Sequence, residues 1–163
     1  MQFCYLARLL ENDGNSNRKY MSVDKETRLA LEDLMTEFAW RVDHGQANLV
    51  HELFTQNGSI KAPGLKLDGR NEIARVFGER AKSTGRVSRH LWSNPRFESI
   101  GDGHVRTTTV VQTFFFTLEE GDQPPVANNN FIVGDSIDVM RRENDGCWRF
   151  ESRQLQVCFA PQS

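Results

Sequence analysis

The chain has 163 residues, enough for one domain with a substantial core, and its 38% hydrophobic and 26% charged residues are typical of a globular protein. The 20 basic and 22 acidic residues are mixed along the chain and give a net charge of −2, so neither a nucleic-acid-binding surface nor a nucleic-acid partner is expected. The longest apolar run is too short to span a bilayer, and three cysteines without paired spacing favour reduced thiols in a cytoplasmic protein.

The first part of the chain predicts an arm followed by helices. Residues 11–17 are polar and turn-forming, so residues 1–21 are interpreted as an N-terminal arm and residues 22–163 as a single domain. A helix is predicted over 24–44, capped by Ser22 or Asp24 and stopped at Gly45. Its apolar residues recur at helical spacing, at Leu31, Leu34, Met35, Phe38 and Val42. The next predicted elements are a short helix from 47 to about 58, strands at 59–62 and 65–67, and a helix over 70–82.

The rest of the chain is typical of strands joined by short turns. They are predicted at 86–100, 105–118, 131–142 and 148–159, with a polar loop over 119–127. Three helices followed by a long antiparallel meander predict an α+β fold rather than a parallel α/β sheet. We expect a cone-like, curved antiparallel sheet with the three N-terminal helices on its concave side, enclosing a pocket.

Asp43 and His90 are the candidate catalytic residues. Asp43 closes the first helix, where the helix dipole disfavours an anion, so its carboxylate needs a compensating partner or instead caps the next helix. His90 shares one strand face with Ser88 and Trp92, and the alternative for it is a strand histidine with an ordinary hydrogen bond. If the first helix packs across the sheet, Asp43 orients the imidazole of His90 as a general base.

Other residues are candidates for binding a ligand. Arg153, on the last predicted strand, either binds an anionic group or pairs with Glu151. Large aromatic side chains usually belong to the core, but in a cone-shaped fold some of them line a cavity: Phe38, Trp40, Trp92, Phe114 and Phe116. The four histidines have neither His-x-His nor His-Glu-x-x-His spacing, so no metal site is expected.

Five short stretches occur in a fixed order over about residues 22–160. They are RVDHG at 41–45, LFTQNG at 53–58, LDGRNEI at 67–73, RHLWSN at 89–94, and DVMRR through GCWRF to Arg153 at 138–153. With these stretches the chain resembles the SnoaL-like branch of the nuclear-transport-factor-2-like superfamily. The resemblance implies a cone of curved sheet around a pocket. The superfamily includes dehydratases, isomerases, polyketide cyclases, a lindane dehydrochlorinase and non-catalytic small subunits of ring-hydroxylating dioxygenases.

The resemblance also implies an activity. Asp43 and His90 match the positions of an Asp and a His in the dehydrochlorinase and the scytalone dehydratases. This implies a lyase or isomerase without cofactor or metal, acting on a small, hydrophobic cyclic or polyketide-like molecule. The alternative is a non-catalytic ligand-binding or assembly module. In the enzyme interpretation Phe38, Trp92 and Phe114 shape the pocket and Arg153 binds a substrate oxygen.

The resemblance has one gap and one further implication. Scytalone dehydratases and ketosteroid isomerases use pocket tyrosines, whereas both tyrosines here, Tyr5 and Tyr20, lie in the arm. The base and its orienting carboxylate therefore match, and the electrophilic group does not. Sheets of this superfamily commonly pair, and residues 110–116 are apolar on both strand faces. A homodimer or homotrimer through the sheet is expected.

Overall fold

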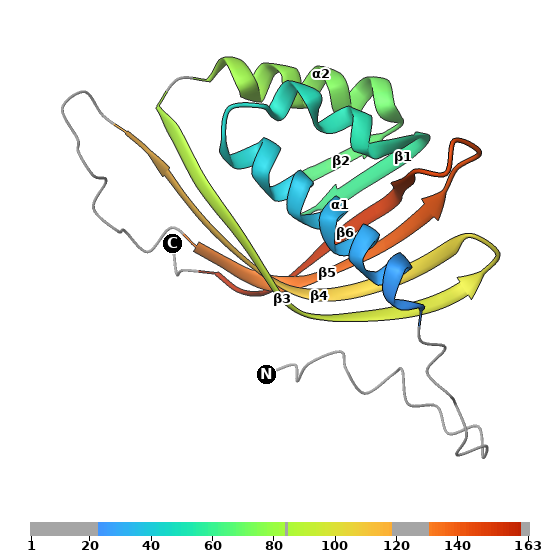
Figure 1. The fold of residues 1–163 in the computed structure, drawn as a ribbon. Coiled ribbons are helices and arrows are strands. Elements are labelled where there is room, and N and C mark those ends of the chain that lie inside the picture. The colour runs from blue at the N-terminus through green and yellow to red at the C-terminus, as the bar shows by residue number, and fades with distance from the viewer. Residues whose placement is uncertain (1–22, 84, 119–130, 161–163) are drawn as a thin grey trace.

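The computed structural model describes residues 23–83, 85–118 and 131–160, so the predicted arm and the predicted loop over 119–127 lie outside the described residues. The α+β prediction is confirmed: the helices lie on the concave side of one curved sheet (Figure 1). In chain order the elements are α1 (Lys25–Asp43), the 3-10 helix η2 (Ala47–Leu53), β1 (Phe54–Ala62), β2 (Leu65–Asp68), α2 (Arg70–Lys82), β3 (Arg86–Gly101), β4 (His104–Thr117), β5 (Phe131–Arg142) and β6 (Trp148–Phe159).

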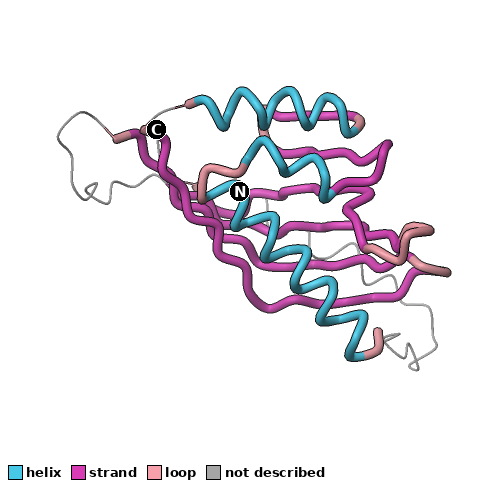
Figure 2. Tube along the Cα trace, turned by 45° about the horizontal axis from the view of Figure 1, so that its top comes forward, coloured by secondary structure: helices cyan, strands magenta, loops and turns pink. Residues whose placement is uncertain are grey.

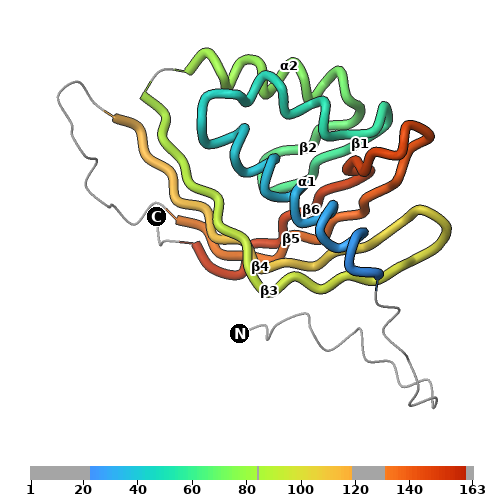
Figure 3. Tube along the Cα trace, in the orientation of Figure 1, coloured from blue at the N-terminus to red at the C-terminus, as the bar shows by residue number. Residues whose placement is uncertain are grey.

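The sheet has six strands in the order β2-β1-β6-β5-β4-β3. The last strand returns to the middle of the sheet and pairs with β1 in parallel, while the other neighbouring strands are antiparallel. The sheet is therefore mixed, and the expectation of a purely antiparallel sheet is wrong for this one pair. Figure 3 follows the long β3 and β4 as they bend around the helices. A bulge between Ser93 and Arg96, with Asn94 at φ 52°, allows β3 to bend.

Helix α1 lies across the inner face of the sheet, and its N-terminus is capped by Asp24, whose side chain accepts the Thr27 N–H at 2.8 Å. Figure 2 shows α1 in front of the strands. Its apolar residues recur every three or four positions, so they point to the sheet together and leave the polar ones outside. The core below it joins all the elements through buried side chains: Leu31, Leu34, Met35, Val50, Phe54, Ile73, Val105, Met140 and Phe150.

The second predicted helix differs from the structure. It is a 3-10 helix that ends at Leu53, and β1 begins at Phe54 rather than at residue 59. Phe54 is fully buried, and its backbone is already extended at φ −110° and ψ 149°. At Gly58 a Cβ atom would lie 2.9 Å from the carbonyl oxygen of Phe150, so this glycine allows β1 to approach β6 closely. The apolar residues that suggested a longer helix are therefore buried where η2 gives way to β1, and their burial does not require the residue spacing of an α-helix.

The two faces of the sheet differ in what covers them. Side chains of β4 and β5 that point inward, such as Thr107, Thr109 and Asp138, are buried beneath the helices. Their outward neighbours, such as Val110 and Ile137, are only half-buried. In the described part of the chain, no helix has the length and apolar character needed to cross a membrane.

Candidate active site

The structure brings Asp43 and His90 into direct contact. Asp43 is the last residue of α1, and His90 lies on the inner face of β3. The Asp43 Oδ1 atom lies 2.6 Å from His90 Nδ1, and Oδ2 accepts the His90 backbone N–H, also at 2.6 Å. The alternative cap role for Asp43 does not hold, because η2 begins at Ala47 and its N-cap position, Gln46, has no side-chain cap hydrogen bond.

The Asp43 carboxylate is buried but well supplied with donors. Its side chain is only 4% exposed, and a third hydrogen bond comes from the Ser88 hydroxyl, 2.7 Å from Oδ1. Burial alone would raise the pKa of Asp43, but the hydrogen bonds and charge of His90, together with Ser88, outweigh it and hold the pKa below 3.8. An ionised carboxylate only accepts hydrogen bonds, so the proton of this contact belongs to His90 Nδ1.

Ser88 connects the pair to helix α2. Its buried hydroxyl oxygen accepts a hydrogen bond of 3.0 Å from Arg80 Nη2 while donating to Asp43. Arg89, the residue between Ser88 and His90, donates to the backbone carbonyl of Asp43 at 3.5 Å. Three elements, α1, α2 and β3, are thus joined by hydrogen bonds around the Asp43 carboxylate.

A small pocket lies beside His90, with a cavity volume of about 30 Å³, or about 300 Å³ when the open space at its mouth is included. Its wall is mostly apolar and comes from α1 and the inner face of the sheet: Met35, Phe38, Ala39, His90, Leu91, Trp92, Thr109, Val111 and Arg153. Small, largely apolar pockets with a few convergent polar groups are the usual form of a small-molecule site. The pocket offers two such groups, the imidazole of His90 and the guanidinium of Arg153.

Arg153 is held in the pocket wall by aromatic rings and one buried carboxylate. Its Cζ atom lies 3.9 Å from the centre of the Phe38 ring and 4.4 Å from that of Phe150. Nη2 lies 3.3 Å from Asp138 Oδ2, whereas Nη1 is buried and has no hydrogen-bond partner among the described residues. Burial lowers the pKa of Arg153, and Asp138 opposes that change. The partner expected from the sequence, Glu151, pairs with Arg141 and His104 instead.

The aromatic residues predicted to line the pocket lie in different places in the structure. Phe38 and Trp92 line the pocket beside His90, whereas Phe114 is not among its lining residues. Phe114 follows Thr113, the residue paired with His90, so it lies on the outer face, 38% exposed and against Phe131. The sequence had no cue for choosing a face here, because apolar residues follow one another on β4.

Three residues of the site were not predicted. Ser88 could be found, because strand alternation puts it on the same face as His90. Arg80 and Asp138 had no such signal, since their contacts join distant elements. Among the described residues, no three His, Cys, Asp or Glu side chains are grouped as metal ligands would be.

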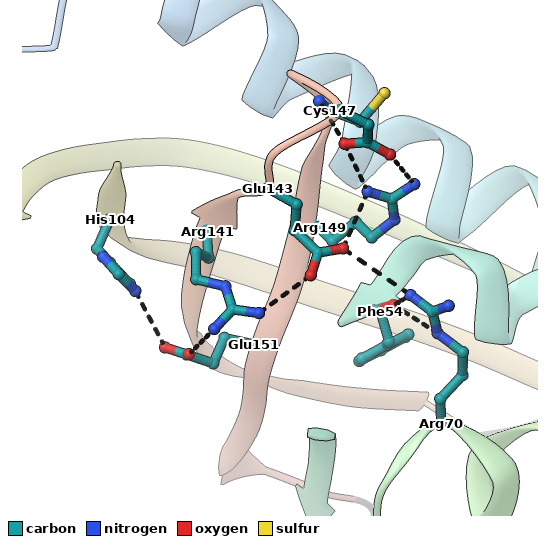
Figure 4. A network of polar contacts seen from close by, with 9 residues as sticks. Phe54, Arg70, His104, Arg141, Glu143, Cys147, Arg149 and Glu151 are labelled. Atoms are coloured by element: carbon teal, nitrogen blue, oxygen red, sulfur yellow. Dashed lines mark hydrogen bonds and ion pairs between the residues drawn. The ribbon is translucent and has the colours of Figure 1, made fainter. Parts of the chain in front are cut away.

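A second polar network lies at the hairpin between β5 and β6 (Figure 4). Glu143 is its centre, with Arg149 at 2.9 Å, Arg141 at 3.0 Å and Arg70 at 4.0 Å. Arg70 also donates to the Phe54 carbonyl, which ties α2 to the start of β1. None of these residues lines the pocket next to His90, so the network is interpreted as structural.

The fold and the pocket agree with a family comparison. The model of the SnoaL-like domain matches residues 24–154, and the chain belongs to this family. No curated protein matches the sequence.

Solved structures show the same fold. A proposed scytalone dehydratase from Novosphingobium aromaticivorans is 19% identical with a TM-score of 0.69, covering 85% of this chain and 87% of its own. A hexachlorocyclohexane dehydrochlorinase, LinA type 2, is 16% identical with a TM-score of 0.68, covering 85% and 90%. ActVI-ORFA from Streptomyces coelicolor is 17% identical with a TM-score of 0.67, covering 82% and 98%. At these identities the likeness concerns the fold alone.

Proposed function

We propose that the chain is a cofactor-independent, dehydratase-like lyase or isomerase acting on a small cyclic or polyketide-like molecule. One observation carries the proposal: the 2.6 Å contact between Asp43 and His90 Nδ1, beside an apolar pocket that His90 lines. The names of the similar structures, a dehydratase and a dehydrochlorinase among them, support the reaction class.

The proposed chemistry begins at His90 Nε2. With Nδ1–H held by Asp43, Nε2 is the nitrogen with a free lone pair, and it takes a proton from a substrate carbon. The electron pair left on carbon then expels a leaving group from the neighbouring carbon, or shifts a double bond. Asp43 remains ionised and stabilises the imidazolium that forms. His90 returns the proton to the leaving group or to the shifted position.

Arg153 is the proposed electrophilic group. Its guanidinium lines the pocket and carries a buried nitrogen, Nη1, without a partner among the described residues. A substrate oxygen that gains negative charge would be stabilised by such a fixed donor. Phe38, stacked on the guanidinium, and Trp92 would hold the apolar part of the substrate.

Replacement of His90 tests the proposal. A thermal-shift screen of cyclic carbonyl compounds first supplies a ligand, and turnover is then followed by mass spectrometry. His90→Ala should lower kcat/KM by about a hundredfold or more, the usual contribution of a general base. His44→Ala is the matched control, because His44 is exposed and its ring stacks on Trp40 and bonds the Trp40 carbonyl. If turnover survives in His90→Ala, the mechanism is wrong; if the ligand binds without turnover in wild type, the chain is a binding module.

The outer face of the sheet is the proposed site of self-association. Several outward positions on β4 and β5 carry apolar side chains that are only half-buried, Val110, Ile137 and Val139 among them. Pairing this face would remove apolar surface from water in a homodimer or homotrimer. Light scattering after size exclusion should give a dimer or trimer that Ile137→Lys dissociates. Leu29→Lys, on exposed α1 surface, should leave the mass unchanged, and a monomeric wild type would contradict the proposal.

A further inference from the structure

We propose that Arg80 is a positioning residue of the candidate site: acting through the Ser88 hydroxyl, it fixes the hydrogen bonding of Asp43 and disfavours a positive charge on His90. This inference rests on the proposed function for its meaning, since a neutral imidazole is what a general base requires. The contacts themselves do not depend on which substrate is used.

The direction of the Ser88 hydroxyl follows from its two partners. A guanidinium only donates hydrogen bonds, so Arg80 Nη2, at 3.0 Å, occupies a lone pair of the Ser88 oxygen. The hydroxyl proton is then directed to Asp43 Oδ1, 2.7 Å away. That same carboxylate oxygen accepts His90 Nδ1–H. Ser88 therefore accepts a hydrogen bond from Arg80 and donates one to Asp43 at the same time, and this connects the guanidinium to the carboxylate.

The sharing of one carboxylate oxygen limits how strongly Asp43 attracts a proton to the imidazole. An isolated buried carboxylate beside a histidine strongly favours the imidazolium. Here part of the charge on Oδ1 is already stabilised by Ser88, and the positive charge of Arg80 lies one hydrogen bond further away. Both effects disfavour a second positive charge on His90, and loss of Arg80 or of the Ser88 hydroxyl would remove part of that opposition.

Other charged or titratable groups lie around the dyad, on β3, β6 and α1. Arg86 and Arg89 lie on β3 with His90, and Arg153 lines the pocket from β6 and is paired with Asp138. On α1, His44 follows Asp43 and bonds the Trp40 carbonyl. Of these arginines, Arg80 is the one joined to the Asp43 side chain through a hydrogen bond to Ser88. Burial and Arg86 lower the pKa of Arg80, and Asp43 opposes this; arginine nonetheless remains charged.

A purely structural role is the competing explanation. Arg80 would then only fasten α2 to β3, and its loss would change stability without changing the titration of His90. The two explanations therefore differ in a spectroscopic readout that needs no substrate.

The experiment is an NMR titration of the His90 ring nitrogens in the full chain. In Arg80→Gln the imidazole pKa should rise by about half a unit or more, because a positive charge and a fixed donor are lost. Ser88→Ala should raise it in the same direction, and Arg80→Lys should restore much of the wild-type value. Arg75→Gln is the matched control, since it removes an exposed charge from the same helix.

The outcomes separate this proposal from the proposed function. An unchanged His90 titration in folded Arg80→Gln overturns the positioning role, whether or not His90→Ala abolishes turnover. If Arg80→Gln does not fold, Ser88→Ala decides, because it cuts the same connection while leaving Arg80 in place. An unchanged titration in that variant also overturns the proposal. If turnover does not require His90 but the titration shifts as expected, the proposed function fails and the electrostatic link stands.

Discussion

The carboxylates of Asp43 and Asp138 are both buried between the helices and the inner face of the sheet, and their pKa values are shifted in opposite directions. Asp43 is 4% exposed and Asp138 is 0% exposed. Asp43 accepts three hydrogen bonds, and its pKa is held below 3.8. Asp138 has the Ser136 hydroxyl at 2.8 Å and Arg153 at 3.3 Å, and burial raises its pKa although Arg153 opposes the rise. For Asp43 the hydrogen bonds and the charge of His90 outweigh the effect of burial on the pKa, whereas for Asp138 burial outweighs the effect of its partners.

The opposite pKa shifts of Asp43 and Asp138 agree with the different side chains that the two carboxylates contact. Asp43 contacts His90, a side chain that changes charge in the proposed reaction, and must remain an anion while it does so. Asp138 contacts Arg153, which is always charged, and its main effect is to hold that guanidinium in place. The first carboxylate should therefore affect rate more than stability, and the second stability more than rate.

The largest effect on stability is expected for Asp138→Ala. The change leaves the Arg153 guanidinium buried without its carboxylate partner, which typically costs about 3–5 kcal/mol of unfolding free energy. Urea denaturation followed by fluorescence measures this. Asp135→Ala is the control, because Asp135 lies on the same strand but on the outer face, and it should cost less than about 1 kcal/mol. Equal losses for the two variants would contradict the distinction.

Asp43→Asn should act mainly on the reaction. The amide is similar in size to the carboxylate but cannot stabilise an imidazolium, and it does not hold Nδ1 protonated. We expect kcat to fall by about a hundredfold, equivalent to about 2.7 kcal/mol of activation free energy. Turnover of the ligand found in the screen measures the fall, with the unfolding free energy determined in parallel. A variant with wild-type kcat would show that Asp43 is only structural.

The pH dependence of stability should have opposite sign for the two carboxylates. The folded-state pKa of Asp43 lies below 3.8, so its contribution to stability is present above pH 3.8 and is lost as the pH falls further. The folded-state pKa of Asp138 lies above 3.8, so its contribution falls as the pH rises from 3.8 through that value. Unfolding free energies of wild type, Asp43→Asn and Asp138→Asn between pH 3 and 7 give two difference curves. Curves with the same slope would contradict the comparison.

The sequence predicted the regular elements better than their arrangement. Helix α2 and strands β5 and β6 have the predicted bounds, because periodicity and turn residues act locally. The parallel pairing of β1 with β6 joins distant segments, and no local pattern indicates it. The same holds within the site. The unfavourable position of an anion at a helix C-terminus indicated Asp43, and strand alternation placed Ser88 on the same face as His90. The roles of Arg80 and Asp138 depend on how α2 and β6 pack against the rest of the fold, and no local pattern indicates that packing.

The smallest change in unfolding free energy is expected for replacement of Glu143, which serves as a reference for the Asp138 variant. It contacts more charged partners than Asp138 does, but its side chain is 24% exposed and water replaces much of what is lost (Figure 4). Glu143→Gln should therefore cost only about 1 kcal/mol, and less at high salt because screening weakens the arginine contacts. Glu98→Gln, which breaks one exposed pair with Arg106 at 3.4 Å, is the control and should cost less still. If Glu143→Gln were as costly as Asp138→Ala, the number of ion pairs would matter more than burial. A small loss would instead show that the burial of the Arg153–Asp138 pair contributes more to stability than the number of ion pairs does.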